Sequence, residues 1–432
     1  PLIGGEGSED EFRTLLGICP LPVPIPRSIF NVVALGTIFM LLFTAFAPSQ
    51  NLQSTINKGS NAGVYGLGAL YFTFAASNFI SPSIAFLLGE RFAMLVGGIG
   101  YTLFVAANIL DHHANYFLPL FVMASMANGL GAAILWTAQG SYLTKNSTQE
   151  TMGRNNGVFF GLFQISQVAG NLIAAFLLPS TKDPKQLEGP ARKLFIIFGS
   201  ISALAVVSFL ILRKAPHRPD IDDKPAPSAG QRFVGIFKMA LKKPFLLMVL
   251  IIIYSGLSQA YFAGTFTKLI DDSKNVGYVM ACFGGTDAIM SVVVGRLMNK
   301  VGRKVIMFGS ALCVLAATGM ICLIDQHKFK TEIWVGIIAA VLCGTSDAGF
   351  NTLLTATTGS LFEDDPENAF GAFKLVQAST SAINYVLALD IYPATLMLDI
   401  FLILGSASFF FLDVWYPRVE SPKNEINGDQ TA

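Results

Sequence analysis

The chain has 432 residues, of which 53% are hydrophobic and 13% charged, and its formal net charge is +1. A soluble domain typically carries about 25% charged residues, so most of this chain is not built to face water. The near-neutral charge argues against a nucleic-acid partner, because phosphate backbones are bound by an excess of Lys and Arg. The five cysteines are scattered and form no CxxC pair. We therefore expect packing cysteines and no disulfide framework, metal site or cofactor.

Twelve apolar segments are each long enough to cross a bilayer as a helix, which takes about 20 residues. They lack the alternation of apolar and polar residues that marks membrane strands. The expected fold class is therefore an all-α membrane protein with twelve transmembrane helices in two six-helix bundles. The predicted spans are 29–50, 62–88, 92–110, 117–144, 154–178, 193–213, 245–268, 275–298, 303–324, 332–360, 368–390 and 394–416.

A polar, Pro-rich linker divides these spans into six plus six. The expected parts are an N-terminal tail (1–28), a first bundle (29–213), the linker (214–244), a second bundle (245–416) and a C-terminal tail (417–432). The second half of the linker places Phe233, Ile236, Phe237, Ala240 and Leu241 on one helical face. This pattern predicts an amphipathic helix lying at the membrane surface.

The charges of the loops predict how the chain crosses the membrane. With both termini in the cytoplasm, nineteen Lys and Arg residues fall on the cytoplasmic side and nine on the outside, as the positive-inside rule requires. The acidic loop EDDPE at 363–367 runs against this trend, although acidic residues count little in the rule. In the N-terminal tail, Glu11, Leu15 and Leu16 fit an acidic dileucine sorting signal. The plasma membrane and endolysosomal or vacuolar membranes both stay open as destinations.

A short motif occurs once in each half of the chain. The pattern G-x-F-x-x-x-Q runs from Gly161 to Gln167 and again from Gly371 to Gln377, 210 residues later. Both copies begin a span that follows a short cytoplasmic loop. Two parallel halves with a site between them near the bilayer midplane are an arrangement typical of transporters.

Polar side chains inside the spans mark the candidate site, because an ionisable residue there costs about 2.5–3.5 kcal/mol on insertion scales. Counting from the cytoplasmic helix ends puts Asp287 and Asp347 roughly 16 Å deep and Lys374 roughly 9 Å deep. A dry site favours the neutral, protonated carboxyl, which suggests proton coupling. A structural ion pair between the tenth and eleventh spans is the alternative. The candidate substrate or ion site comprises Asp287, Asp347, Lys374, Gln139, Gln164, Gln167, Asn351 and Gln377.

The basic stretch GRLMNKVGRK, Gly295 to Lys304, lies between two long apolar runs. It predicts a tight cytoplasmic turn after the eighth span, with its cations in the headgroup zone. It resembles the loop motif G-x-L-x-D-R-x-G-R-K of the major facilitator superfamily, with Asn299 in place of the acidic residue. In that family the loop controls switching between outward-open and inward-open states. The resemblance therefore implies a conformational-switch loop formed by Gly295, Asn299, Lys300, Gly302, Arg303 and Lys304.

A narrower resemblance extends over about residues 30–415. The stretches AAILWTAQGSYLT, GRNNGVFFGLFQISQVAGN, DAGFNTLL and FKLVQ are similar to the uncoordinated-93-like branch of that superfamily. Studied members of the branch include a subunit that affects a potassium channel and a chaperone of nucleic-acid-sensing receptors. The resemblance thus implies either role: a carrier or a regulator.

Two functions are therefore expected as alternatives. The first is a secondary carrier that moves a small solute by alternating access, with proton or cation coupling as an option. The second is a non-transporting accessory protein that binds a channel or receptor in the membrane. The partners implied are the lipid bilayer, an unidentified small molecule or ion, and in the second case a membrane protein. We do not expect an enzyme, because no nucleophile–base set or nucleotide loop is evident.

Overall fold

The structure is a computed structural model. It describes residues 27–53, 62–110, 112, 114–179, 184–216, 229–267, 269–270, 273–326, 333–387 and 390–416. The sorting-signal residues Glu11, Leu15 and Leu16 lie outside the described residues, as does the side chain of Asn299. All regular secondary structure in the described part of the chain is helical.

The described residues of the first half form seven α-helices. They are α2 (Arg27–Asn51), α4 (Ala62–Ser77), α5 (Ser81–Leu88), α6 (Glu90–Ala107), α7 (Phe117–Lys145), α8 (Met152–Leu177) and α9 (Pro184–Ser208), the last ending in the short helix η1 (Phe209–Ile211). The α4 and α5 helices form one broken span, bent by 70°. Pro82 lies in the first turn of α5, where its missing N–H needs no partner, so it starts a helix in a new direction.

The second half repeats this plan after the linker helix α11 (Ala229–Ala240). Its helices are α12 (Lys243–Ala260) with the π-helical η2 (Tyr261–Phe266), α13 (Ser273–Val301), α14 (Arg303–Asp325), α15 (Ile333–Leu361), α16 (Pro366–Leu387) and α17 (Ile391–Trp415). Ten of the described helices are long and apolar enough to cross a membrane, and the bent pair α4–α5 gives an eleventh. The twelfth is α16, which has 22 residues but is more polar because it carries Lys374, Gln377 and Asn384.

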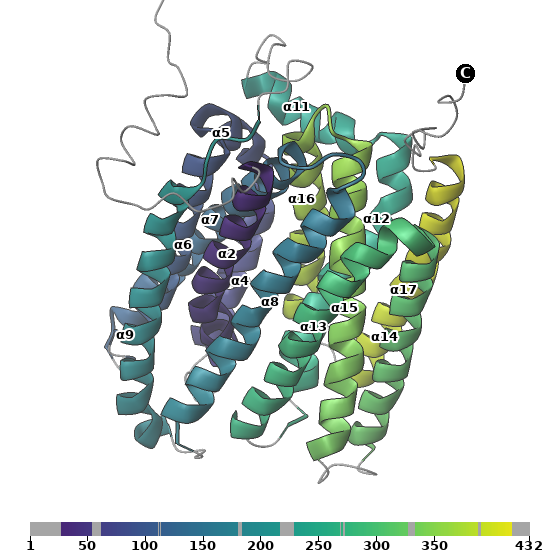
Figure 1. The fold of residues 1–432 in the computed structure, drawn as a ribbon. Helices are drawn as coiled ribbons and strands as arrows, with labels where there is room; N and C mark the ends of the chain where they lie inside the picture. The colour runs from purple at the N-terminus through teal and green to yellow at the C-terminus, as the bar shows by residue number, and fades with distance from the viewer. Residues whose placement is uncertain are drawn as a thin grey trace, which may run out of the picture.

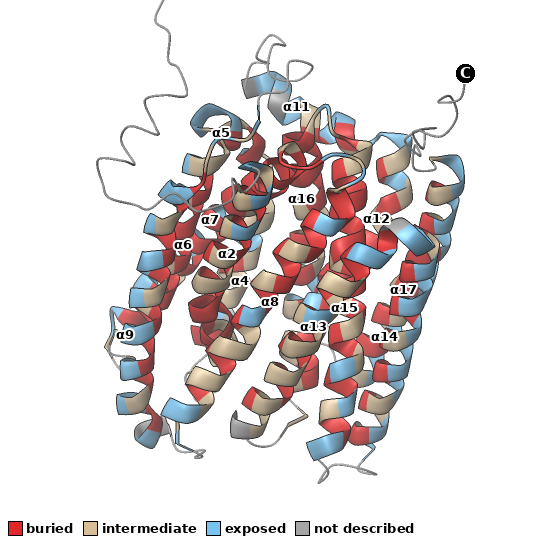
Figure 2. Ribbon diagram, in the orientation of Figure 1, coloured by how far each residue is buried: buried red, intermediate tan, exposed pale blue. Residues whose placement is uncertain are grey.

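The two halves lie side by side as two bundles, each with its own hydrophobic core (Figure 1). One core runs from Val32 to Leu212. The other runs from Ile236 to Leu412 and also takes in Met152 from the first half. Buried residues concentrate on the helix faces that meet inside the molecule, whereas α9, α14 and α17 expose much of their outward surface (Figure 2). The fold is therefore an all-α membrane fold of twelve transmembrane helices in two bundles.

The bundles meet along a seam in which α8 packs against α13, and α16 packs against α4 and α7. On this seam, Gly157 of α8 and Gly295 of α13 bring the two helix backbones close together. A Cβ atom added to either glycine would lie 2.8 Å from the Cα atom of the other. Small residues of this kind let two membrane helices approach with their backbones in contact.

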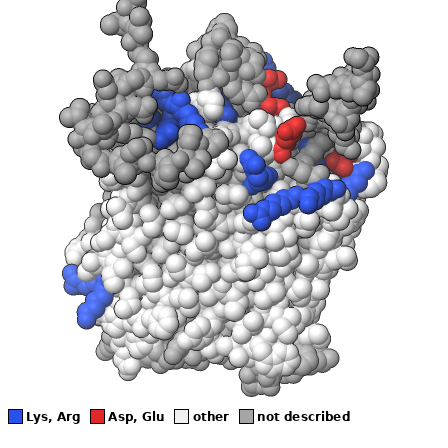
Figure 3. All heavy atoms as spheres, viewed as in Figure 1, with Lys and Arg blue, Asp and Glu red and all other residues white. Residues whose placement is uncertain are grey.

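The linker helix α11 lies across one end of the molecule, which we call the linker end (Figure 1, top). It packs mainly on α16 and α5 and also touches α12. Ile236 is fully buried there, whereas Phe233 and Phe237 are each 45% exposed. The Phe237 ring stacks on Phe79, and the Phe233 ring packs against it at a tilt. Part of the predicted apolar face is therefore buried against the protein, and the rest is exposed at its surface. On the face drawn in Figure 3, charged residues gather near the linker end, and a broad band without them covers the middle.

Candidate functional site

An acidic cluster lies where α8 of the first bundle meets α13 and α15 of the second. The Gln164 amide nitrogen donates to Asp287, and it also lies 3.5 Å from an Asp347 carboxylate oxygen. Ser291 donates to the other Asp287 oxygen over 3.0 Å. Asn351 donates to Asp347 over 2.8 Å. One amide from the first bundle therefore holds two carboxyl groups of the second bundle at the same level of the seam.

The two aspartates differ in their accessibility. Asp287 is 0% exposed and Gln164 is 4% exposed, so this contact is sealed from solvent. Asp347 and Asn351 are only partly buried. Asp287 is therefore fully enclosed, whereas Asp347 keeps part of its surface exposed.

The second polar group of the seam is built around Lys374 of α16. Its ammonium donates to Gln377 over 2.6 Å, and Gln377 donates in turn to Ser255 of α12 over 2.5 Å. The same ammonium lies 4.5 Å from the ring centroid of Trp136 in α7. An aromatic face attracts a cation without neutralising it, and this attraction strengthens where water is excluded. Lys374 of the second bundle therefore contacts the first bundle through the Trp136 ring.

The predicted ion pair between the tenth and eleventh spans is not formed in this structure. All three ionisable side chains are described, and Lys374 makes no ion pair with Asp287 or Asp347. Gln139 is buried, and its amide nitrogen has no hydrogen-bond partner in the described part of the chain. Gln167 accepts a hydrogen bond from Asn171 and packs on Gly284. The structure thus brings six of the eight candidate residues into two groups, while Gln139 and Gln167 stand apart.

The turn after α13 differs from its prediction in one respect. Arg303 is only 3% exposed and donates to the Ser360 hydroxyl over 3.0 Å. Its guanidinium also lies 3.9 Å from Asp413. This cation is therefore buried among helices and is not exposed at the surface, whereas the placement of the turn in the headgroup zone stays a prediction. Arg303 turns inward because α15 and α17 offer it an acceptor and a carboxylate, and it ties α14 to both helices.

The remaining loop residues keep the geometry of a tight turn. Gly302 has a φ of 83°, and Gly89, its counterpart before α6, has a φ of 73°. Such left-handed conformations favour glycine because a Cβ atom would clash with the backbone. Lys300 is exposed, and Gly295 lies on the seam. The two halves therefore use the same backbone device to turn from one span into the next.

A set of ionic contacts that we did not predict joins the bundles at the linker end. The Lys145 ammonium of α7 lies 2.6 Å from Glu90 and 3.0 Å from Glu367 of α16. Ser141 donates to Glu367 over 2.8 Å. Beside them, Gln149 donates to the backbone oxygen of Ser360 over 3.0 Å. The acidic stretch at 363–367 was the available signal, since its place among basic cytoplasmic loops calls for cationic or donor partners.

The charge state of Glu367 follows from these contacts. Glu367 precedes the span predicted at 368–390 and is 8% exposed. Burial alone would raise its pKa, but the Lys145 ammonium and the Ser141 hydroxyl outweigh that effect and lower the pKa below its usual value. Glu367 is therefore ionised at neutral pH, and the contact is a true ion pair.

At the opposite end, aromatic residues join the bundles. The rings of Tyr71 in α4 and Tyr385 in α16 stack with centroids 5.1 Å apart. The Gln50 amide donates to the Tyr71 hydroxyl over 2.8 Å and lies 3.5 Å from the Tyr385 hydroxyl. The polar groups of the seam thus lie between an ionic contact at one end and an aromatic contact at the other.

Comparison with known proteins assigns the family. Residues 53–410 match the family described as "Ion channel regulatory protein UNC-93". The chain belongs to the UNC-93 family. Its relatives include the UNC93-like protein MFSD11 of Xenopus tropicalis, which is 28% identical over 90% of this chain and 97% of the relative. Protein unc-93 homolog A of Bos taurus is 30% identical over 81% of this chain and 84% of the relative.

Solved structures identify the fold of this UNC-93 family member. It superposes on the Escherichia coli fucose:proton symporter FucP with a TM-score of 0.67 and 15% identity, covering 90% of this chain and 99% of FucP. A FucP structure in the outward conformation gives a TM-score of 0.65 with the same coverage. At this identity the likeness shows the fold alone, which is that of the major facilitator superfamily. The recognition made from the loop motif and the WTAQG and FKLVQ stretches is confirmed.

Proposed function

We propose that this UNC-93 family member is a secondary-active transporter that moves a small solute by alternating access, coupled to a proton or another cation. The observation that carries the proposal is the hydrogen bonding of Gln164 on one bundle to both Asp287 and Asp347 on the other. Alternating access needs a contact between the bundles whose strength depends on what is bound. A pair of acids, one buried and one partly buried, that shares one donor meets that need.

Coupling follows from the electrostatics of the pair. Two ionised carboxylates around one amide repel each other, and the repulsion is stronger in a dry interior than in water. A proton or a cation between the two carboxyl groups removes that repulsion. The Gln164 amide can then donate to both groups. Loss of the ion would weaken the closed seam, because the same amide cannot neutralise two negative charges.

The solute would bind between the acid pair and Lys374. Asn351 and Gln377 each keep oxygen or nitrogen atoms near these charged groups. Lys374 makes no direct ion pair with Asp287 or Asp347 in the described part of the chain and donates to Gln377 instead, so it favours an anionic or strongly polar group on the solute. The ionic contact around Lys145 and the Tyr71–Tyr385 stack would then open in turn at the two ends.

The test is solute-driven ion movement in proteoliposomes that contain the full chain and a trapped pH-sensitive dye or, in parallel vesicles, a trapped Na⁺- or K⁺-sensitive dye. Sugars, amines and organic acids are added outside one class at a time, with Na⁺ and K⁺ varied separately. We expect a signal with at least one class, and Asp347→Asn should abolish it. Asp399→Asn is the matched control, because Asp399 contacts Thr318 within the second bundle and not the seam. No signal with any class, or an unchanged Asp347→Asn, overturns the proposal.

The second candidate is an accessory protein that regulates an ion channel. The description of the family as ion channel regulatory favours it. Such a protein needs a stable surface for its partner and no solute cycle. Co-purification of a channel subunit with the full chain, unaffected by Asp347→Asn and combined with absence of flux, would support this candidate over the first.

For location, we propose that both termini face the cytoplasm and that the destination is the plasma membrane or an endolysosomal or vacuolar membrane. The loop charges support the orientation. Glu11, Leu15 and Leu16 supply the sorting signal. Imaging of a Leu15→Ala, Leu16→Ala double variant tests this, since an unchanged distribution removes the signal from consideration.

A further inference from the structure

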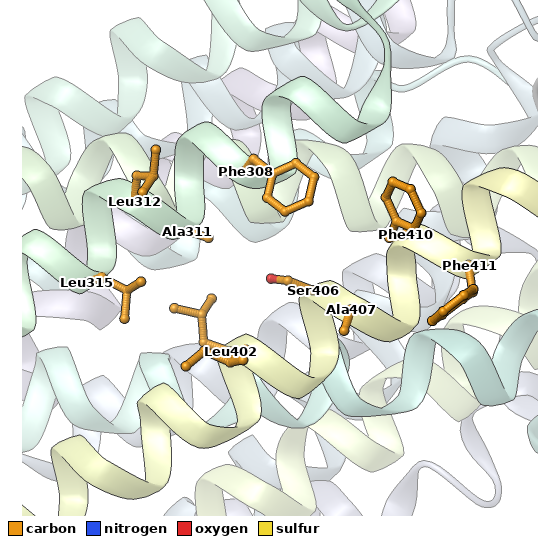
Figure 4. Close-up of a pocket in the computed structure, with 10 residues that line it drawn as sticks. Phe308, Ala311, Leu312, Leu315, Leu402, Ser406, Ala407, Phe410 and Phe411 are labelled. Carbon is orange, nitrogen blue, oxygen red and sulfur yellow. The ribbon is translucent and has the colours of Figure 1, made fainter.

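An apolar groove of about 560 Å³ lies between α14 and α17, on the outer side of the second bundle and away from the seam (Figure 4). The small residues Ala311, Ser406 and Ala407 leave room at its centre. Bulky side chains such as Phe308 and Leu312 form its walls. The main contacts of α14 and α17 are with each other and with helices of the second bundle, so the proposed transport site makes no use of this groove.

The end of the groove nearest the linker end carries excess positive charge. Phe410 lines the groove, and the Lys304 ammonium lies 4.6 Å from the centroid of its ring. Asp413 lies 3.8 Å from Lys304 and 3.9 Å from Arg303, so Lys304 shares this carboxylate with a second cation. Lys300, one turn earlier in the chain, is exposed. A negative group at this end therefore finds a cation that is only partly neutralised.

One turn deeper, the groove offers an unused hydroxyl. Ser406 precedes Phe410 by four residues, about 6 Å along the helix. It is 7% exposed, and its hydroxyl has no hydrogen-bond partner in the described part of the chain. Serine hydroxyls in helices commonly bond back to a carbonyl of the preceding turn, as Ser200 and Ser208 do here. Figure 4 shows the Ser406 oxygen facing the space between the two helices.

We propose that this groove binds one anionic phospholipid from the leaflet at the linker end. From that end inward, the groove presents a cation, a hydroxyl and then the apolar side chains Leu312, Leu315 and Leu402. A phospholipid presents its phosphate, its ester carbonyls and its acyl chains in the same order. The phosphate lies at Lys304, an ester carbonyl accepts from Ser406, and an acyl chain fills the apolar part.

The charge of the site selects the headgroup. A zwitterionic lipid brings its own cation beside the phosphate and gains little from Lys304. An anionic headgroup gains about 1 kcal/mol for each Lys or Arg near the surface, which is about a fivefold change in affinity. A transmembrane helix of another protein would fill the apolar part but would leave the excess positive charge unanswered.

The experiment uses the full chain purified in detergent and measures retained lipid by native mass spectrometry. The protein is incubated with phosphatidylglycerol or with phosphatidylcholine of the same chain length. We expect one phosphatidylglycerol per chain to be retained in preference to phosphatidylcholine. Lys304→Gln should weaken retention about fivefold. Ala407→Leu should abolish retention, because the added carbons occupy the groove.

Matched variants distinguish lipid binding in the groove from lipid binding elsewhere on the protein. Lys238→Gln removes an exposed cation of α11, and Ala203→Leu enlarges an exposed residue of α9; both should retain the lipid. Leu312→Trp narrows the same groove by enlarging a side chain that is 68% exposed. Thermal unfolding checks that each variant is folded.

Three results would overturn the proposal. They are equal retention of both lipids, retention by Ala407→Leu and Leu312→Trp, and a membrane protein that co-purifies and is lost with Ala407→Leu. The readout is lipid retention and not flux, so the outcome is independent of the proposed transport function.

Discussion

At the scale of single residues, the seam is held by charges that depend on one another. Glu367 is ionised because Lys145 lies beside it, and Lys145 is shared with Glu90 of the first bundle. Removing the charge of Glu367 would leave Lys145 paired within its own bundle. The contact across the linker end would then lose its main electrostatic component.

The variant Glu367→Gln should therefore favour opening at the linker end by about 1–3 kcal/mol, the range for hydrogen bonds to charged groups. Spin labels placed on α5 and α16 would report this as a longer distance population. Asp364→Asn is the control, because Asp364 is exposed in the same loop. Equal distances in Glu367→Gln and the wild type would contradict the role given to this ion pair.

The pH dependence of this contact has a definite sign. A lowered carboxyl pKa stabilises the closed contact above the usual Glu value of about 4.3, and that stabilisation is lost as pH falls through the lowered pKa. The wild-type distance at the linker end should thus stay constant from about pH 8 to pH 5. A transition near neutral pH in the same spin-label measurement would rule out Glu367 as the group that holds this end closed.

Some of these residues were accessible from the sequence and others were not. Counting residues along the spans sufficed to predict that Asp287 and Asp347 share a level. That both lie within reach of the Gln164 amide depends on the angle at which α8 crosses α13, which no local pattern contains. The burial of Arg303 was missed for a similar reason, since its acceptors lie on α15 and α17, far along the chain.

At the scale of helices, the crossing of α8 and α13 limits how the bundles fit. A Cβ atom at Gly157 would lie 2.5 Å from the Ser291 carbonyl oxygen and 2.8 Å from the Gly295 Cα atom. Both are backbone atoms, so only a shift of a whole helix relieves the clash. The spacing of the bundles is thus fixed by two residues without side chains.

Gly157→Ala should destabilise the protein by about 1–3 kcal/mol, the usual cost of overpacking, and should lower the Tm in detergent. Gly199→Ala is the control, because nothing lies within 4 Å of a Cβ atom there. Alanine is the better helix former by about 1 kcal/mol, so the control should raise the Tm or leave it unchanged. A Gly157→Ala protein as stable as wild type would show that the seam tolerates a wider spacing.

The linker helix α11 shows what the spacing of apolar residues cannot predict. Apolar residues at helical spacing predicted α11, but that spacing is the same whether the face meets lipid or protein. Ile236 and Met239 are buried against neighbouring helices, and Leu241 is 72% exposed. Only the three-dimensional packing of α5 and α16 decides which apolar residues are covered.

At the scale of the whole molecule, the twelve spans and two bundles were predictable because hydropathy and loop charge act along the chain. Orientation is the corresponding testable property. Cysteine introduced by Asp364→Cys at the linker end should react with a membrane-impermeant maleimide only after the membrane is permeabilised. Tyr116→Cys, at an exposed position in a loop predicted to be outside, should react in intact cells. The reverse pattern would invert the proposed topology.

The contact between Lys374 and the Trp136 ring allows ligand binding to be followed by tryptophan fluorescence. The chain has three tryptophans, and Trp334 and Trp415 are 54% and 64% exposed. Replacing those two with phenylalanine would leave Trp136 as the single tryptophan, with an ammonium over its face. Any molecule that draws this ammonium away alters the local field at the indole and shifts its emission. Unlabelled compounds can thus be screened by the shift in Trp136 emission before their transport is measured.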